Sequence, residues 1–152
     1  MARRRARELA FRTLFQSERG ASPLLEVWYT VRSEALESDD EADEDTAYGE
    51  PLDTEGLDFA GELLKLFEDN RGVIDAALTR SVEGWTFAQM SQTDLNVLRL
   101  AATEMRFTDT PAPVVIEMAV RLAKKFGGEE SGRFVNGVLA KLLRDPEVSD
   151  GG

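Results

Sequence analysis

The segment LAKKFGGEESGRFVNGVL, residues 122–139, decides the fold. Apolar residues recur at three- and four-residue steps on both sides of the Gly127-Gly128 pair, as they do on one face of an α-helix. We therefore predict one helix over 114–126, a glycine turn, and a last helix from about 129 to 143. Such a glycine pair favours a tight corner between two packed helices.

The same helical period continues toward the N-terminus. Ser91 is a predicted N-cap for a helix that ends before Thr110-Pro111-Ala112-Pro113, because proline disfavours helix in the preceding residue. Earlier periodic stretches cover about 3–18, 23–36 and 57–78, the last as one helix or as two that meet near 70–72. No segment alternates like a strand. The sequence thus predicts an all-α protein of six to seven helices.

Composition excludes several kinds of chemistry. The 152 residues suit about one domain. The chain has no cysteine and no histidine, so it lacks thiolate nucleophiles, the commonest metal ligand and the commonest general base. No apolar run is long enough to span a membrane. We expect a soluble, cytoplasmic protein that is not an enzyme and holds neither a metal nor another cofactor.

The net charge of −11 is unevenly distributed. Residues 34–58 hold 12 acidic residues and no basic one. Removing those 12 from the 29 acidic residues leaves 17, against 18 basic residues, so the rest of the chain is nearly neutral. Because the apolar period also disappears there, we predict an acidic flexible insertion at 37–56.

Four arginines lie at the predicted start of the first helix, where the helix dipole disfavours cations. A solvated basic end and a phosphate-binding arm are about equally good interpretations of this run alone. Phe15, Phe126 and Phe134 could stack on RNA bases, yet each also lies near an apolar stripe, where core packing is the simpler interpretation. Composition does not choose between them.

Five stretches resemble the bacterial transcription antitermination factor family NusB. They are RRRARELA (3–10), LFQ (14–16), DLNVLRLA (94–101), PVVI (113–116) and, most closely, the segment 122–139. The resemblance runs through the chain in order, except for the acidic insertion and both ends.

The resemblance implies a function as well as a fold. Members of this family are all-helical, with two small bundles, and have no catalytic activity. With NusE, a small-subunit ribosomal protein, they bind the boxA segment of ribosomal RNA operon transcripts and help RNA polymerase resist termination. The resemblance also allows a homodimer. We accordingly expect a single helical domain over 1–143, with a tail at 144–152.

The RNA-binding residues carried over from the family fall at both ends of the chain. Phe15 replaces a frequent tyrosine, and Glu130 replaces a frequent aspartate. Gly137 is interpreted as structural, allowing close helix approach. The predicted RNA-binding set is Arg3, Arg4, Arg5, Arg7, Phe15, Phe126, Glu130, Arg133 and Phe134.

Three questions have alternative answers. Asp94 is either a helix cap or, less favoured, a contact for NusE, since an acidic residue suits a basic partner. The whole protein could also be a helical scaffold that binds or sequesters a ribosomal protein without RNA. A domain that guides a ribosomal RNA methyltransferase is less favoured, because the chain has no glycine-rich cofactor loop and no cysteine.

Overall fold

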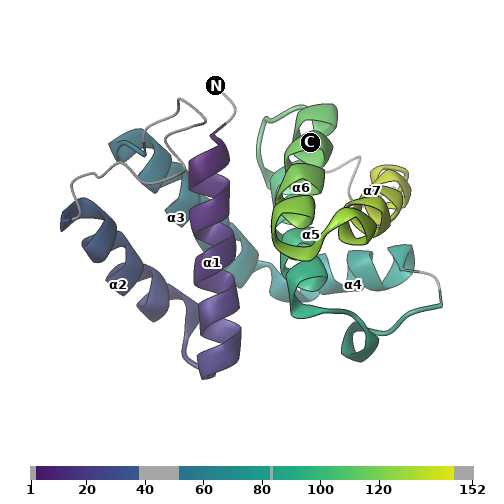
Figure 1. Cartoon of the computed structure of the whole chain (residues 1–152), viewed down its shortest axis with the longest axis horizontal. Helices are drawn as coiled ribbons and strands as arrows, with labels where there is room; N and C mark the ends of the chain where they lie inside the picture. The colour runs from purple at the N-terminus through teal and green to yellow at the C-terminus, as the bar shows by residue number, and fades with distance from the viewer. Residues whose placement is uncertain (1–2, 38–51, 83, 146–152) are drawn as a thin grey trace. The chain divides into compact units, whose positions relative to one another are not determined.

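The computed structural model describes residues 3–37, 52–82 and 84–145. These residues form α-helices and one short 3₁₀ helix, and they contain no strand, which confirms the all-α prediction (Figure 1). The elements are α1 (Arg4–Gly20), α2 (Leu24–Glu37), α3 (Thr54–Asp69), α4 (Arg71–Ser81), η2 (Phe87–Gln89), α5 (Gln92–Phe107), α6 (Ala112–Gly127) and α7 (Glu129–Leu143).

The chain divides into two compact units, Met1–Lys65 and Leu66–Gly152. Unit 1 contains α1, α2 and most of α3, and unit 2 contains α4 to α7. This agrees with two helical bundles. The boundaries proposed for one domain, 1–143, stay a prediction.

Unit 1 is built on the apolar face of α1. Ala6, Ala10 and Leu14 follow each other at four-residue steps, and all are buried. Small residues allow close packing elsewhere in the unit: a Cβ on Gly61 of α3 would lie 2.7 Å from the indole Nε1 of Trp28 on α2. Alanine and glycine therefore let larger side chains fill this small core.

Unit 2 is organised around α5, whose residues Leu95 to Glu104 are all buried. This helix packs against α4, α6 and α7. Its Arg99 makes two hydrogen bonds to Asp75 of α4, of 3.0 and 2.9 Å, and lies over the rings of Phe67 and Phe87. The charged group is thus paired and enclosed by aromatic rings rather than left unsatisfied in the core.

The observed helix ends follow the predicted signals with small shifts. Asn70 separates α3 from α4, so the stretch from 57 forms two abutting helices. α3 begins at Thr54, three residues earlier than expected, because the Asp53 carboxylate accepts a hydrogen bond of 2.9 Å from the Gly56 amide. Thr54–Gly56 are therefore helical; most of the predicted insertion, 38–51, lies outside the described residues.

Residue 145, at the start of the predicted tail 144–152, is held by side-chain contacts with the rest of unit 2. Asp145 accepts hydrogen bonds of 2.8 and 3.1 Å from Arg80 of α4. Its side chain is 8% exposed, so this ion pair anchors the residue that follows α7 by two positions. Residues 146–152 of the predicted tail are outside the described part. Among the described helices, none is both long and apolar enough to cross a membrane.

Candidate nucleic-acid interface

The arginine cluster opens α1, as predicted. Arg3 is the N-cap residue and has a left-handed backbone with φ 57°, while Arg4, Arg5 and Arg7 follow in the first turn. All four are partly exposed. The first turn holds no acidic residue, so the partial positive charge of the helix end adds to the arginine charges. The result is a local concentration of positive charge at the start of unit 1.

An aromatic ring that the sequence reasoning missed supports this cluster. The guanidinium carbons of Arg3 and Arg7 lie 4.7 and 5.3 Å from the ring centroid of Phe59 on α3. Two cations on one ring are held in place by the ring quadrupole and by contact with its surface. The periodicity around Phe59 predicts a helix but gives no sign that its ring meets the arginines.

Phe15 lies farther along α1. It is partly exposed, packs at 6.0 Å against the ring of Phe11, and has the Arg19 guanidinium 5.8 Å from its centroid. It follows Arg4 by eleven residues, about three helical turns and roughly 16 Å, so the two side chains lie on similar sides of α1. Phe15 therefore retains accessible ring surface within unit 1.

The corner between α6 and α7 depends on its two glycines for different reasons. Gly128 has φ 95°, a conformation that favours glycine. A Cβ on Gly127 would clash with Oγ of Ser131 and lie 2.8 Å from its Cβ, so a side chain there would force the corner to shift. The Ser131 hydroxyl donates to the Gly127 carbonyl at 3.2 Å. These contacts fix the direction in which α7 leaves the turn.

Three of the predicted residues are exposed around this corner. Phe126 is 36% exposed, with the Lys125 ammonium 5.6 Å from its ring centroid. Glu130 and Arg133 are exposed in the first turns of α7. The corner thus offers an aromatic surface, donor groups and a carboxylate acceptor, which together can stack on a base and hydrogen-bond to its edge.

Phe134 is partly exposed rather than fully buried. Its ring packs edge-to-face against Trp85, with centroids 5.6 Å apart and an interplanar angle of 62°. Both predicted interpretations therefore apply in part, since one side of the ring has a packing partner while some surface is accessible. None of the three predicted phenylalanines is completely buried.

Asp94 supports the start of α5. The Ser91 hydroxyl accepts a 3.0 Å hydrogen bond from the Asp94 amide, which confirms Ser91 as the cap. Burial raises the pKa of the Asp94 carboxyl, partly offset by hydrogen bonding with Ser131 and Ser91. Asp94 thereby connects the start of α5 with the first turn of α7, which favours a structural role for its side chain.

The surroundings of Gly137 correct one interpretation. We expected this glycine to allow close approach of another helix, but no atom lies within 4 Å of the position of a Cβ there. Gly137 is exposed at the middle of α7. The close approach of α7 to α6 occurs at Gly132 instead, where a Cβ would lie 2.6 Å from the side chain of Lys124.

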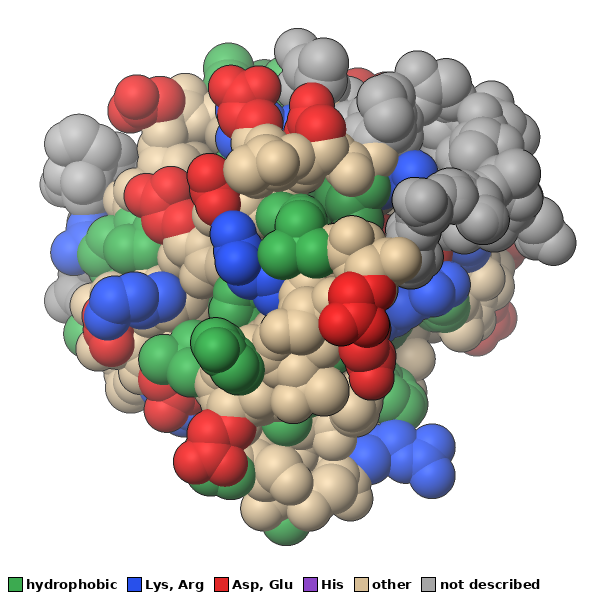
Figure 2. Space-filling model, turned by 90° about the vertical axis from the view of Figure 1, so that its left-hand side faces the viewer, with side chains coloured by type: hydrophobic (Ala, Val, Ile, Leu, Met, Phe, Trp, Pro, Cys, Tyr) green, Lys and Arg blue, Asp and Glu red, His purple; other side chains and the backbone are tan. Residues whose placement is uncertain are grey.

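Charges elsewhere on the surface are mixed. On the face drawn in Figure 2, acidic and basic side chains are interspersed instead of forming one large area of a single sign. This face therefore offers an anionic ligand no extended positive area, only local groups of basic side chains. In the described part of the chain, no group of three acidic, histidine or cysteine side chains could hold a metal ion.

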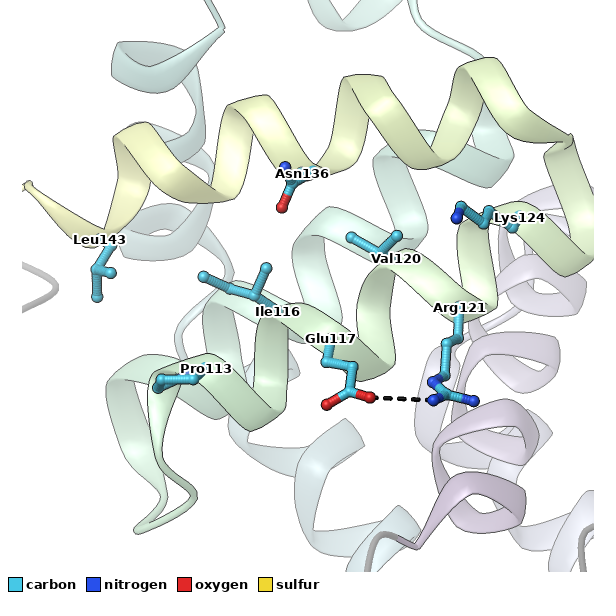
Figure 3. A pocket seen from close by; sticks show the side chains of 8 residues that line it. All are labelled: Pro113, Ile116, Glu117, Val120, Arg121, Lys124, Asn136 and Leu143. Carbon is cyan, nitrogen blue, oxygen red and sulfur yellow. Dashed lines mark hydrogen bonds and ion pairs between the residues drawn. The ribbon is translucent and has the colours of Figure 1, made fainter.

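An open groove of about 830 Å³ lies between α6 and α7. Figure 3 shows Ile116 and Val120 of α6 pointing toward α7, with the Glu117–Arg121 ion pair, 3.0 Å long, at the edge. None of the residues that line the groove is aromatic, and none belongs to the predicted RNA-binding set. The groove is therefore separate from the candidate interface.

Comparison with known proteins decides the family. The model of the NusB family matches residues 4–144. The chain belongs to the NusB family. The transcription antitermination protein NusB of Deinococcus deserti is 50% identical over 142 residues, which are 93% of this chain and 80% of that protein. The NusB of Thermus thermophilus is 48% identical over 93% of this chain and 90% of its own length. The resemblance noted in the sequence is confirmed.

Solved structures agree with this NusB assignment. A structure of T. maritima NusB has a TM-score of 0.78 and 31% identity, and the match covers 98% of this chain and 95% of that one. The structure described as antitermination factors NusB and NusE in complex with dsRNA has a TM-score of 0.76 at 22% identity, covering 94% of this chain and 96% of that one. The second likeness concerns the fold alone.

Proposed function

We propose that this protein is a transcription antitermination factor that binds boxA RNA of ribosomal RNA operon transcripts together with NusE. Membership of the NusB family, whose relatives carry the name transcription antitermination protein, is the observation that carries the proposal. A related structure is described as NusB and NusE with dsRNA. The arginine cluster and the α6–α7 corner supply chemistry suited to RNA.

The two surfaces have different roles in this proposal. Arg3, Arg4, Arg5 and Arg7 contact phosphates, which raises affinity without selecting a sequence. Phe15, Phe126 and Phe134 stack on bases, while Arg133 adds a cation beside them. Glu130 is an exposed carboxylate that can accept from a base amino group, so it contributes to sequence choice.

The proposed role is binding without a catalytic step. The sequence has neither histidine nor cysteine. The described residues also form no cluster of candidate metal ligands, and the buried Arg99 is paired with Asp75. The factor would act in the cytoplasm as part of the RNA polymerase antitermination complex.

A gel-shift or anisotropy titration tests the proposal. The protein is titrated with boxA RNA and with a scrambled RNA of the same composition, each with and without NusE. We expect preference for boxA and tighter binding when NusE is present. Equal affinity for the two RNAs, with or without NusE, would contradict the proposal, and NusE binding with no effect of RNA would favour the protein-only scaffold.

A further inference from the structure

Trp85 is an exposed aromatic residue that the proposed RNA-binding set leaves out. It lies between α4 and α5 and is 49% exposed, whereas the other tryptophan, Trp28, is partly buried against Gly61. The Trp85 ring packs edge-to-face against the ring of Phe134, and their centroids are 5.6 Å apart. An exposed tryptophan beside a partly exposed phenylalanine presents an aromatic surface of the kind that marks interaction sites.

Gly137 is a second feature that packing within the fold does not explain. A glycine at the middle of an exposed helix is less favourable than alanine. Such a cost is usually offset where another group approaches the backbone closely, yet no atom of the described residues, apart from the helix's own backbone, lies within 4 Å of the Cβ position at Gly137. The described part of the chain therefore leaves the space over this part of α7 open.

Helical spacing places Gly137 close to Phe134, the ring that Trp85 contacts. Gly137 follows Phe134 by three residues and Arg133 by four, so all three lie on one side of α7. Arg133 is exposed, as is Gly137. Trp85 extends this surface beyond Phe134. Stacking rings and an arginine are groups that bind a single nucleic-acid strand, and the missing side chain at Gly137 leaves room beside them.

We propose that Trp85 and Phe134 form a two-ring stacking site for RNA bases and that the strand continues along the exposed face of α7 over Gly137. The missing side chain lets a sugar or phosphate group contact the helix, with Arg133 beside it. This inference rests on the proposed RNA-binding function and extends it to two residues, Trp85 and Gly137. A protein partner on the same face is the competing outcome.

Fluorescence and affinity test the role of Trp85. In a Trp28→Phe protein, Trp85 is the remaining tryptophan, and its emission should be quenched on titration with boxA RNA. The matched control, Trp85→Phe, retains only Trp28, and its emission should not change. Trp85→Ala should weaken boxA binding about tenfold, the loss of one stacked base. Unchanged emission of Trp85 or unchanged affinity of Trp85→Ala would overturn the proposal.

A pair of glycine variants tests the path over α7. Gly137→Ala and Gly72→Ala both add a methyl group at an exposed helical glycine with no atom within 4 Å. Neither should lower the melting temperature. Only Gly137→Ala should weaken boxA binding, by at least threefold. Equal RNA affinity of the two variants would overturn the proposal, as would a loss confined to NusE binding.

Wild-type binding separates this inference from the proposed function. If the wild-type protein does not prefer boxA to scrambled RNA, the proposed function itself fails. If the wild type shows that preference and the Trp85 and Gly137 variants keep it at full affinity, only the further inference fails.

Discussion

Phe59 holds two of the arginines that the sequence assigns to RNA. Arg3 and Arg7 both lie over its ring, so their guanidinium groups are oriented before any ligand arrives. Ordering long side chains in advance lowers the entropy lost on binding. An arginine cluster that would otherwise be a flexible basic end thereby becomes a defined surface.

Replacing the ring tests this role at constant charge. Phe59→Leu should weaken boxA binding several-fold, because Arg3 and Arg7 lose their support, while the salt dependence of binding stays the same. Loss of the cation–ring contacts should lower stability by only about 1 kcal/mol. The measurements are RNA affinity at several salt concentrations and a urea unfolding curve. Unchanged affinity would show that the ring does not prepare the arginines.

Asp94 makes the stability of the folded protein depend on pH. Burial raises the pKa of its carboxyl above the ordinary value for aspartate, and hydrogen bonding with Ser131 and Ser91 offsets only part of the rise. Since the folded state favours the protonated form, Asp94 contributes to stability below pH 3.8, and this contribution is lost as pH rises through the folded-state pKa.

Asparagine at this position stays neutral at every pH. Asp94→Asn should therefore melt at a higher temperature than the wild type at pH 7, and the difference should shrink as pH falls toward 3.8. Thermal unfolding followed by circular dichroism between pH 7 and 4 measures this. A difference that grows toward acid pH would contradict the argument.

Single residues were the hardest scale to predict from sequence. Periodicity places Phe134 near the apolar stripe of its helix, but only the fold shows that Trp85 covers one side of it. Arg99 lies within a motif that resembles the family, yet its pairing with Asp75 joins residues 24 positions apart. Contacts between helices depend on tertiary packing, which a periodic pattern does not encode.

At the scale of elements, the α6–α7 corner holds the exposed residues that we assign to RNA binding in unit 2. Its direction depends on Gly127, whose missing side chain makes room for Ser131. Phe126 precedes that glycine, and Glu130 follows it by three residues. A shift of the corner would move both groups together.

Adding one methyl group should disturb this corner. Gly127→Ala places a Cβ 2.8 Å from Cβ of Ser131, a contact that rotation of the serine side chain does not relieve. We expect a loss of about 1–3 kcal/mol in stability and weaker boxA binding. Urea unfolding and an RNA titration measure the two effects, with Gly72→Ala as the control. Stability equal to that of the wild type would contradict the steric argument.

Elements themselves were well predicted where local signals are strong. Ser91, the proline-rich break before α6 and the Gly127-Gly128 pair each fix a boundary through local chemistry, and the helices begin and end close to them. The 3₁₀ helix at Phe87–Gln89 was not predicted, because three residues are too few to show a period. The early start of α3 reflects capping by Asp53 within an acidic stretch.

At the scale of the whole molecule, charge is divided along the chain. The protein carries a net charge of −11, yet the arginines at residues 3–7 form a local cationic cluster next to a helix N-terminus. Charges farther away than a Debye length, about 8 Å at physiological salt, are largely screened, so the groups close to a bound strand matter most. We therefore assign RNA affinity to local charge rather than to the total.

The salt dependence of boxA binding tests this assignment most directly. Affinity is measured across a range of salt concentrations for the wild type, for the variant with Arg3, Arg4, Arg5 and Arg7 replaced by alanine, and for the variant with lysine at the same four positions. Four phosphate contacts on a single strand contribute a log–log slope of roughly −3. We predict that the alanine variant binds more weakly, with a slope flatter by about that amount, and that the lysine variant keeps the wild-type slope. An alanine variant with the wild-type slope would contradict the account.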